Sequence, residues 1–228
     1  MGRKSFEAYG ALAKSALSPT QQAGRYSNQT KAEGLIAPDV ADKLQLGKSD
    51  VLVDIGCGPG KITLQLAPLV LHVKAIDHPE IVKRLHAPNL ATIGGNFLDL
   101  EMTGTATKVL IYSVMHYLSS ADEALAFIAK AAALLEPQGR LLVGDLPNVD
   151  RKRRFMASEA GKAFDAEWRK NPGEAPRIED SESYAITDML LLDWLKDFRA
   201  RGFDAWVLPQ NPELPFGHTR EDLLIVRP

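Results

Sequence analysis

Apolar runs and helix-like segments alternate in the middle of the chain, between residues 51 and 145. Five short apolar runs have the pattern of strands that are buried on both faces; they are residues 51–55, 72–77, 90–93, 108–112 and 140–145. Helix-like segments follow the first, second and fourth of these runs; they are residues 60–69, 79–86 and 121–135. This alternation predicts an α/β fold in which a parallel sheet carries helices on both faces.

The N-terminal part of the chain shows a weaker pattern. Residues 1–30 are polar, and a few apolar positions among them fall on one helical face. A short helix is predicted to follow Pro38, with Gly47 as its stop. These segments therefore predict small helices that precede the sheet.

The C-terminal part changes character twice. Residues 147–183 are polar and charged, which predicts an insertion or lid that is partly helical. Residues 184–201 have a continuous apolar face and predict a helix that ends at Gly202. Runs at 204–208 and 222–226 then predict a hairpin-like antiparallel pair of strands at the edge of the sheet.

Composition narrows the class of protein. The chain has 228 residues, 45% of them apolar and 25% charged, as is ordinary for a soluble enzyme. It carries 27 Lys and Arg against 29 Asp and Glu, a net charge of −2, which argues against nucleic acid or an anionic membrane as the main partner. Cys57 is the only cysteine, so no intramolecular disulfide forms and a reducing compartment is expected. No secretory signal and no apolar stretch of ~18 residues is present, which predicts a cytoplasmic protein without a membrane span.

A glycine-rich loop is the most informative motif. Residues 54–60, Asp-Ile-Gly-Cys-Gly-Pro-Gly, follow a predicted strand and open a predicted helix. Glycines at such a turn let the backbone bend sharply and let a ligand lie against bare main chain. A dinucleotide site would place its third glycine at position 61, which is Lys61, so a nicotinamide-dependent dehydrogenase is disfavoured.

Four further motifs follow the loop in order. Asp77 ends the second predicted strand, and a carboxylate there can accept both hydroxyls of a ribose. Asn96 and Phe97 follow the third strand, Ser113-Val114-Met115-His116-Tyr117-Leu118 follows the fourth, and residues 135–141 form a Pro-Gln-Gly turn before the fifth. Together with the glycine loop, residues 51–145 resemble the class I S-adenosylmethionine-dependent methyltransferases. Gln138 replaces the first glycine of the family's L-x-P-G-G-x-L turn, and Asn96 stands where the family usually has an acid.

The resemblance implies a fold and a division of the chain. The implied fold is a doubly wound, seven-stranded, mostly parallel sheet whose last strand is inserted antiparallel. All 228 residues would form one methyltransferase domain. Its parts would be N-terminal cap helices at 1–47, a cofactor-binding half at 48–146, an insertion or lid at 147–183, and a C-terminal helix and strands at 184–228.

The resemblance also implies a cofactor and its contacts. S-adenosylmethionine would be bound and S-adenosylhomocysteine released, and the ammonium and sulfonium charges of the cofactor suit an acid beside the loop. The expected cofactor contacts are Asp54, Gly56, Cys57, Gly58, Gly60, Asp77, His78, Asn96, Phe97, Ser113 and Tyr26. Plainer interpretations stand beside some of them. Asp77 would also serve as a cap for a helix at Pro79, Cys57 as a small residue of the turn, and His78 as a packing or surface residue.

Three residues are candidates for catalysis. His116 follows the fourth strand, Asp145 ends the fifth, and His218 lies in the loop before the last strand, so all three belong to the rim where this fold holds its substrates. His116 would act as a general base toward a hydroxyl acceptor. Packing or exposure in a loop explains each histidine equally well. No cluster of acids or histidines predicts a metal site.

The acceptor remains open at this stage. The resemblance, with weaker similarity of residues 144–155 and 214–225 to bacterial methyltransferases of surface-polysaccharide synthesis, implies a small-molecule acceptor, a hydroxyl of a sugar or nucleotide-linked sugar among them. The basic run at 151–154 would bind an anionic group of the acceptor or form a solvated face. The alternatives are a methyltransferase of RNA or protein and a non-catalytic binding module. The sequence also leaves open whether the chain forms a homodimer.

Overall fold

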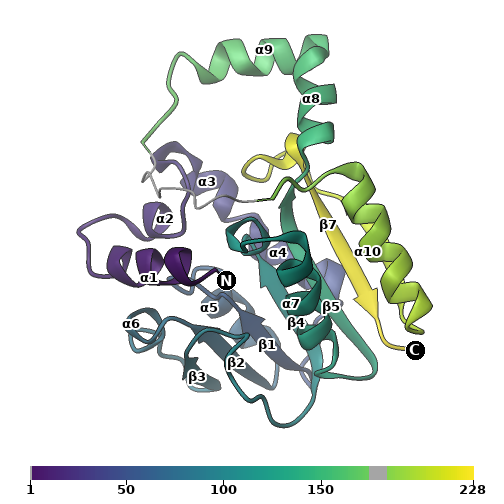
Figure 1. Ribbon diagram of the computed structural model, residues 1–228. Coiled ribbons are helices and arrows are strands. Elements are labelled where there is room, and N and C mark those ends of the chain that lie inside the picture. Colours follow the sequence, from purple (N-terminus) through teal and green to yellow (C-terminus); the bar gives the residue numbers. More distant parts are fainter. Residues whose placement is uncertain (1, 175–183) are drawn as a thin grey trace.

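A seven-stranded sheet forms the centre of the protein in the computed structural model, which describes residues 2–174 and 184–228 (Figure 1). Its strand order is β3-β2-β1-β4-β5-β7-β6. The strands are β1 Val51–Ile55, β2 His72–Asp77, β3 Leu90–Gly94, β4 Ala106–Tyr112, β5 Leu135–Pro147, β6 Asp204–Pro209 and β7 Arg220–Val226. The first five strands pair in parallel, and β7 is antiparallel to both β5 and β6. The predicted fold class is confirmed.

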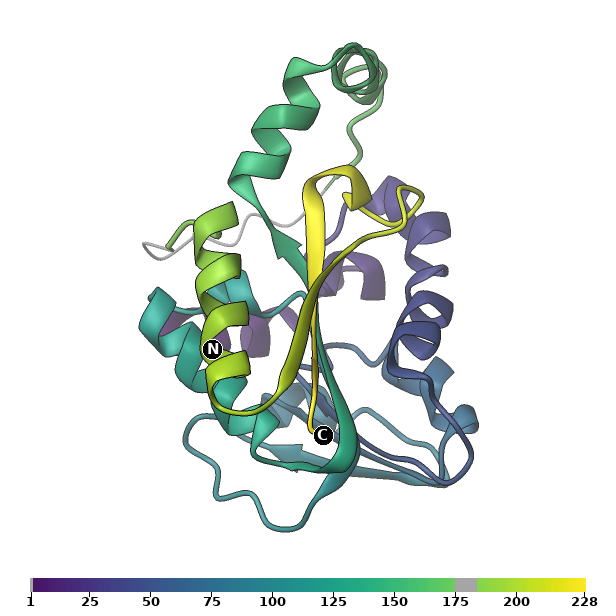
Figure 2. The ribbon, with the colours of Figure 1, turned by 90° about the vertical axis from the view of Figure 1, so that its right-hand side faces the viewer.

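Helices cover both faces of this sheet, as the edge-on view shows (Figure 2). On one face, Val53 and Val109 pack in a core with α7 (Ala121–Ala132) and α10 (Asp188–Ala200). On the other face, Leu52 and Leu110 pack in a core with α4 (Ile36–Leu44) and α5 (Thr63–Leu66). Neighbouring residues of one strand point to opposite faces, so the continuous apolar runs of the sequence are explained by burial on both sides.

The remaining helices are short and belong mostly to the N-terminal segment. They are α1 Arg3–Leu12, α2 Pro19–Gln22, α3 Thr30–Glu33, α6 Pro79–Val82 and four 3₁₀ turns at Ser27–Gln29, Ala67–Leu69, Met115–Tyr117 and Gly217–Thr219. In Figure 1 the helices α1, α2 and α3 lie beside the carboxyl ends of β1, β2 and β4. The N-terminal segment therefore covers the edge of the sheet where the glycine loop lies.

Two of the predicted helices are interrupted or shorter than expected, and a third is shifted toward the N-terminus. The helix predicted at 60–69 is α5 followed by a 3₁₀ turn, because Pro68 cannot donate a hydrogen bond within a regular helix. The helix predicted at 79–86 ends at Val82, and Leu85 instead packs against Gly60. The helix after Pro38 already begins at Ile36 and ends at Leu44, where a left-handed Gln45 rather than Gly47 stops it.

Strand β5 is longer than the predicted run 140–145 and is irregular near its end. Its pairing with β7 shifts between Val143 and Leu146, which marks a bulge at Gly144 and Asp145. Asp145 has φ +61°, a left-handed conformation that is unusual for a residue other than glycine. Bulges re-aim the side chains they carry, and this one lies at the carboxyl end of the sheet.

The predicted insertion forms an arm that projects from the sheet (Figure 2). Its described part contains α8 Val149–Ala157 and α9 Glu159–Trp168, and residues 175–183 lie outside the described residues. Asn148, which is buried, fixes the base of the arm. Its Nδ2 donates to Asp188 of α10 at 2.7 Å and to Glu221 of β7 at 2.6 Å. Among the helices of the described residues, none is long and apolar enough to span a bilayer.

Candidate active site

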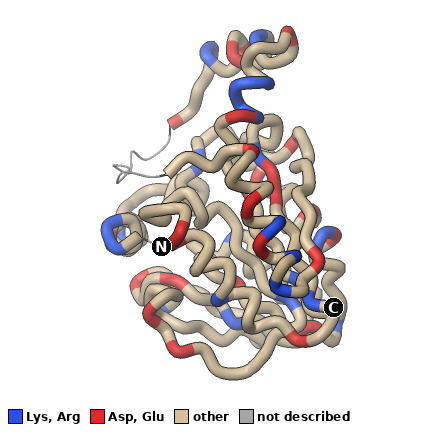
Figure 3. The backbone as a smooth tube through the Cα atoms, turned by 45° about the vertical axis from the view of Figure 1, so that its right-hand side comes forward, with Lys and Arg blue, Asp and Glu red and all other residues tan. Residues whose placement is uncertain are grey.

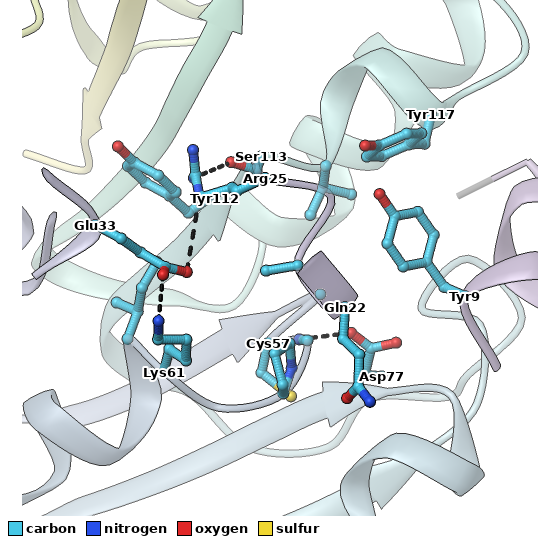
Figure 4. Close-up of a pocket in the computed structure, with 16 residues that line it drawn as sticks. Tyr9, Gln22, Arg25, Glu33, Cys57, Lys61, Asp77, Tyr112, Ser113 and Tyr117 are labelled. Carbon is cyan, nitrogen blue, oxygen red and sulfur yellow. Dashed lines mark hydrogen bonds and ion pairs between the residues drawn. The ribbon is translucent and has the colours of Figure 1, made fainter. Parts of the chain in front are cut away.

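A pocket opens at the carboxyl ends of β1, β2 and β4, between the glycine loop and the N-terminal segment (Figure 4). Its volume is about 570 Å³ including the open mouth. Figure 4 shows Tyr9 and Tyr117 facing each other on one side and Arg25, Glu33 and Lys61 on the other. The pocket lies where open α/β sheets bind their ligands, outside the carboxyl ends of neighbouring strands.

The glycine loop forms one wall of this pocket from main-chain atoms that no side chain covers. Gly56, Cys57 and Gly58 line it, and the two glycines have φ +79° and +53°. A Cβ at Gly56 would come within 2.4 Å of Val114, whereas a Cβ at Gly58 would meet no protein atom within 4 Å. The space over Gly58 is therefore available to a ligand. Gly60 is absent from the lining of this pocket; its φ of +79° and its contact with Leu85 give it a packing role.

Asp77 stands between this pocket and a second, adjoining one. Its Oδ2 accepts a hydrogen bond from the Gly58 amide at 2.8 Å and its Oδ1 accepts one from the His78 amide at 2.6 Å. Burial raises the pKa of Asp77, although these two amides act in the opposite direction. The carboxylate is thus held in place by main-chain donors and lines both pockets.

The adjoining pocket, of about 260 Å³, has aromatic walls. Asn96 and Phe97 line it together with Phe6 and Phe127, and the rings of Phe97 and Phe127 meet edge to face at 5.0 Å. A flat heterocycle fits such walls, and Asp77 is placed to accept from the hydroxyls of an attached ribose. The two pockets share Gly56, Asp77 and Val114 and so suit a nucleoside that carries a charged tail.

Asp54 is not among the residues that line either pocket. It is fully buried in β1, and its Oδ2 accepts a hydrogen bond from the Thr63 hydroxyl at 2.6 Å. Burial raises the pKa of Asp54 to about 7. The acid before the first glycine therefore ties β1 to α5 in this structure.

Asp54→Asn should make the protein more stable at pH 8 and leave its stability near that of the wild type at pH 4. The folded protein keeps the Asp54 proton up to about pH 7, while the unfolded chain releases it near pH 4, so the free energy of unfolding of the wild type falls as pH rises between these values. Asparagine keeps the Thr63 hydrogen bond without ionising. Urea unfolding of both proteins at the two pH values measures the difference, and parallel pH profiles would contradict the assignment.

Two other expected cofactor contacts lie elsewhere. His78 is not among the lining residues of the two pockets; its Nδ1 accepts from the Glu80 amide at 3.1 Å and its ring packs on Phe6 at 4.8 Å. Tyr26 lies outside both pockets and faces a third cavity, described below. Its neighbour Arg25 instead lines the pocket at the glycine loop, which we call the cofactor pocket after the ligand that the sequence predicts there.

Five charged side chains form a continuous chain of alternating sign from the glycine loop to β7. Lys61 pairs with Glu33, and Arg25 lies 4.0 Å from Glu33 and 3.4 Å from Asp145. Arg220 Nε lies 3.4 Å from the other oxygen of Asp145. We call these five residues the charge chain. Its two ends, Lys61 and Arg220, are both cations.

Asp145 is the centre of this chain and is held by several donors. Ser113, which also lines the cofactor pocket and has φ +60°, donates a hydrogen bond to Asp145 Oδ2. Burial by itself raises the pKa of Asp145, but the two arginines outweigh it and hold that pKa below its ordinary value. The carboxylate is therefore ionised at neutral pH. Its Oδ1 is buried and has no hydrogen-bond partner, only the ion pair with Arg220.

A third cavity, which we call the outer cavity, lies between the arm, the N-terminal segment and the loop before β7. It measures about 1410 Å³ with its open mouth included. Tyr26, Trp168 and Phe216 form an aromatic wall, with Tyr26 edge-on to Trp168 at 5.1 Å and to Phe216 at 6.0 Å. Arg220 also lines this cavity, so the charge chain joins the cofactor pocket to the outer cavity.

The two predicted catalytic histidines lie beside these cavities and are not among their lining residues. His116 packs on Tyr117 at 4.0 Å, and burial together with the charge of Arg220 lowers its pKa to about 3. It is neutral at pH 7 and weakly basic. His218 stacks on Phe155 of α8 at 4.6 Å and its carbonyl accepts a hydrogen bond from Arg151 Nε at 3.2 Å.

The sequence analysis missed the charged residues that close the site. Arg25, Glu33 and Arg220 were not singled out, and Lys61 was considered only as a missing glycine. No local pattern marks them, because a charged residue in a polar segment is ordinary. The burial of Arg25 and Glu33 is the feature that distinguishes them, and only the fold reveals it. Among residues 2–174 and 184–228, no three His, Cys, Asp or Glu side chains gather as a metal site.

Comparison with known proteins agrees with this geometry. Residues 53–143 match the family described as a methyltransferase domain. A stretch of 37 residues is 57% identical to a probable cobalt-precorrin-6B C(15)-methyltransferase of Methanothermobacter thermautotrophicus, over 16% of this chain and 19% of that protein. The chain therefore spans about a fifth of the curated relative that it matches.

Solved structures share the whole fold. The N-methyltransferase NodS of Bradyrhizobium japonicum WM9, in complex with S-adenosylhomocysteine, has a TM-score of 0.64 at 13% identity and 99% coverage of both chains. Phosphoethanolamine N-methyltransferase 1 of Haemonchus contortus has a TM-score of 0.72 at 17% identity, covering 99% of this chain and 49% of that one. At such identities the likeness establishes the fold.

The residues matched by the family model include most of those that line the two adjoining pockets around Asp77. Residues 53–143 include the bare glycine loop, Asp77 between its two pockets, and the aromatic walls at Phe97 and Phe127. The shape and donor set of the two adjoining pockets fit S-adenosylmethionine. Residues 53–143 thus match the methyltransferase-domain family, and the whole chain has the fold of class I methyltransferases.

Proposed function

We propose that the protein transfers the methyl group of S-adenosylmethionine to a hydroxyl group of a small molecule that enters through the outer cavity. The observation that carries this proposal is the position of Asp145. It pairs with Arg25, which lines the cofactor pocket, and with Arg220, which lines the outer cavity. Asp145 itself is buried and is not among the lining residues of either cavity, so it lies between the two spaces and links their arginines.

The site residues divide the work of binding the cofactor. Asp77 would accept hydrogen bonds from the ribose, Phe97 and Phe127 would flank the adenine, and the main chain at Gly58 would lie along the tail. Lys61 and Arg25 offer positive charge to the cofactor carboxylate, and Glu33 offers negative charge to its ammonium. When bound, S-adenosylmethionine supplies a methyl group on a positively charged sulfur. The protein contributes mainly by aligning the acceptor with that methyl group and excluding water.

A hydroxyl acceptor needs a group that takes its proton as the new C–O bond forms. Asp145 Oδ1 is buried and ionised and has only the ion pair with Arg220, so an acceptor hydroxyl that reaches it beside Arg220 would donate to it and be held in line. This carboxylate would take the proton of the hydroxyl and pass it on to solvent. His116, neutral but weakly basic, acts beside Asp145 by accepting a hydrogen bond at its unpartnered Nδ1.

A labelling experiment tests both the kind of acceptor and the accepting atom. The protein is incubated with trideuteromethyl-labelled S-adenosylmethionine and a cell extract whose small molecules, RNA and proteins are intact. We expect the label in molecules that pass a size-exclusion filter, on oxygen as shown by fragmentation in the mass spectrometer, and no label with Asp77→Ala. Fragmentation would identify labelled sugars as well as labelled aromatic alcohols. The experiment therefore also tests the resemblance to polysaccharide-associated methyltransferases. Label retained on RNA or protein, or found on nitrogen, would contradict the proposal.

A further inference from the structure

The outer cavity carries positive charge that the rest of the protein does not neutralise. The charge chain alternates in sign and ends in Arg220, so Arg25 and Arg220 share the single carboxylate of Asp145. Arg220 Nε and NH1 are buried and lack hydrogen-bond partners. A buried guanidinium with unused donors is costly unless an acceptor binds it.

The basic run of α8 adds one further cation at the same place. Figure 3 shows this run as a blue band at the base of the arm. Three of its four residues are neutralised: Arg151 pairs with Glu221, Arg153 with Asp150 and Arg154 with Asp188. Lys152 has no ion-pair partner among the described residues and lines the outer cavity with Arg220. From the sequence, the whole run 151–154 is expected to bind an anion. Within this run, Lys152 is the residue whose charge is left for such an anion.

Aromatic side chains form a large part of the remaining wall of the outer cavity, and the carboxylate of its lining, Asp165, is paired with Arg169 at 2.7 Å. Tyr26, Phe164, Trp168 and Phe216 line the cavity, and they come from the N-terminal segment, α9 and the loop before β7. The guanidinium of Arg220 lies 5.1 Å from the centre of the Phe216 ring. Aromatic walls next to two cations accommodate a flat body with a negative end.

We propose that the methyl acceptor is a flat, apolar molecule with one anionic group, and that Lys152 and Arg220 bind this group in the outer cavity while Tyr26, Trp168 and Phe216 pack against its body. The inference rests on the proposed function for its statement that the occupant accepts the methyl group. The shared chemistry is an anion, either a carboxylate or a phosphate, because lysine and arginine bind both.

Binding of three small probes to the protein loaded with S-adenosylhomocysteine tests this. The probes are benzoate, phenyl phosphate and the neutral benzamide, compared at one ionic strength. Quenching of the Trp168 fluorescence reports occupancy, and Trp168→Phe shows which part of the signal comes from this residue. We expect one or both anions to bind at least fivefold more tightly than benzamide. The anion that binds more tightly shows whether the acceptor carries a carboxylate or a phosphate.

Two variants locate the effect. Lys152→Gln removes the unpaired, exposed cation without disturbing the charge chain, and it should weaken anion binding about tenfold while benzamide binding stays unchanged. Lys162→Gln on α9 is the matched control: it is exposed, pairs with Glu159, does not line the cavity and should change neither. Equal binding of benzamide and the anions, or anion binding that Lys152→Gln leaves unchanged, would overturn the inference. If S-adenosylhomocysteine itself fails to bind the wild type, the proposed function fails instead.

Discussion

Asp77→Ala is expected to weaken the binding of S-adenosylhomocysteine by a factor of about 100 or more. The carboxylate is buried, is oriented by the Gly58 and His78 amides, and stands where two ribose hydroxyls would donate to it. Each hydrogen bond to a charged group contributes about 1.5–3 kcal/mol, so two of them account for a loss of this size. Isothermal titration calorimetry on both proteins measures it.

Thermal unfolding provides a second measurement of the same effect. A ligand at ~100 times its dissociation constant stabilises the folded wild type by ~2.7 kcal/mol, and Asp77→Ala should lose this shift at the same concentration. Asp99→Ala, at an exposed residue of the same type, is the matched control and should bind as the wild type does. Affinity for S-adenosylhomocysteine within threefold of the wild type, about 0.6 kcal/mol, would show that Asp77 does not contact the ribose.

Asp145→Ala should lower the free energy of unfolding by about 3–5 kcal/mol, because it leaves the buried Arg25 and Arg220 without the carboxylate that they share. For a chain of this size such a loss corresponds to a fall in melting temperature on the order of 10 °C. Urea unfolding at pH 7 measures the difference. Asp197→Ala is the control: its ion pair with Arg201 has a similar chemistry but is partly exposed, and its removal should cost less than about 1 kcal/mol.

The pH dependence of the free energy of unfolding, compared between the wild type and Asp145→Asn, separates the contribution of the Asp145 charge from that of its packing. The folded pKa of Asp145 lies below its unfolded value, so its contribution to stability is complete above about pH 4 and is lost as the pH falls through the folded pKa. Asp145→Asn keeps the shape and removes the charge. The gap between wild type and Asp145→Asn should therefore narrow as the pH is lowered below 4. A gap that stays constant with pH would contradict the role of the ion pairs.

The strained backbone at Asp145 gives these effects a structural basis. Asp145 and Ser113 both have positive φ, and they hydrogen-bond to each other at the ends of adjacent strands. The Asp145 amide donates to the buried Asp222 at 2.9 Å, which fixes the bulge. Strained residues of this kind persist where the surroundings hold them, and they occur preferentially at functional sites. The bulge turns the Asp145 side chain toward both arginines.

The sequence alone determined the sheet and the cofactor half of the site. Apolar runs at 51–55 and 72–77 match β1 and β2, since a strand buried on both faces must be apolar throughout. The glycine loop and Asp77 lie at the ends of these strands, so their positions follow from local sequence. Helix lengths were predicted less well, because Gln45 and Leu85 end or shorten helices through conformations and contacts that the periodicity does not contain.

The tertiary structure alone decided the acceptor half. Arg25 lies 88 positions before Ser113 and 120 before Asp145, and it contacts both. Such contacts join segments whose own patterns are ordinary, and the bulge that aims Asp145 arises from pairing with β7. The outer cavity likewise needs Tyr26, Trp168 and Phe216 from three distant segments. Periodicity reports which face of an element is buried, but only the packed fold determines which buried charges meet and what space they enclose.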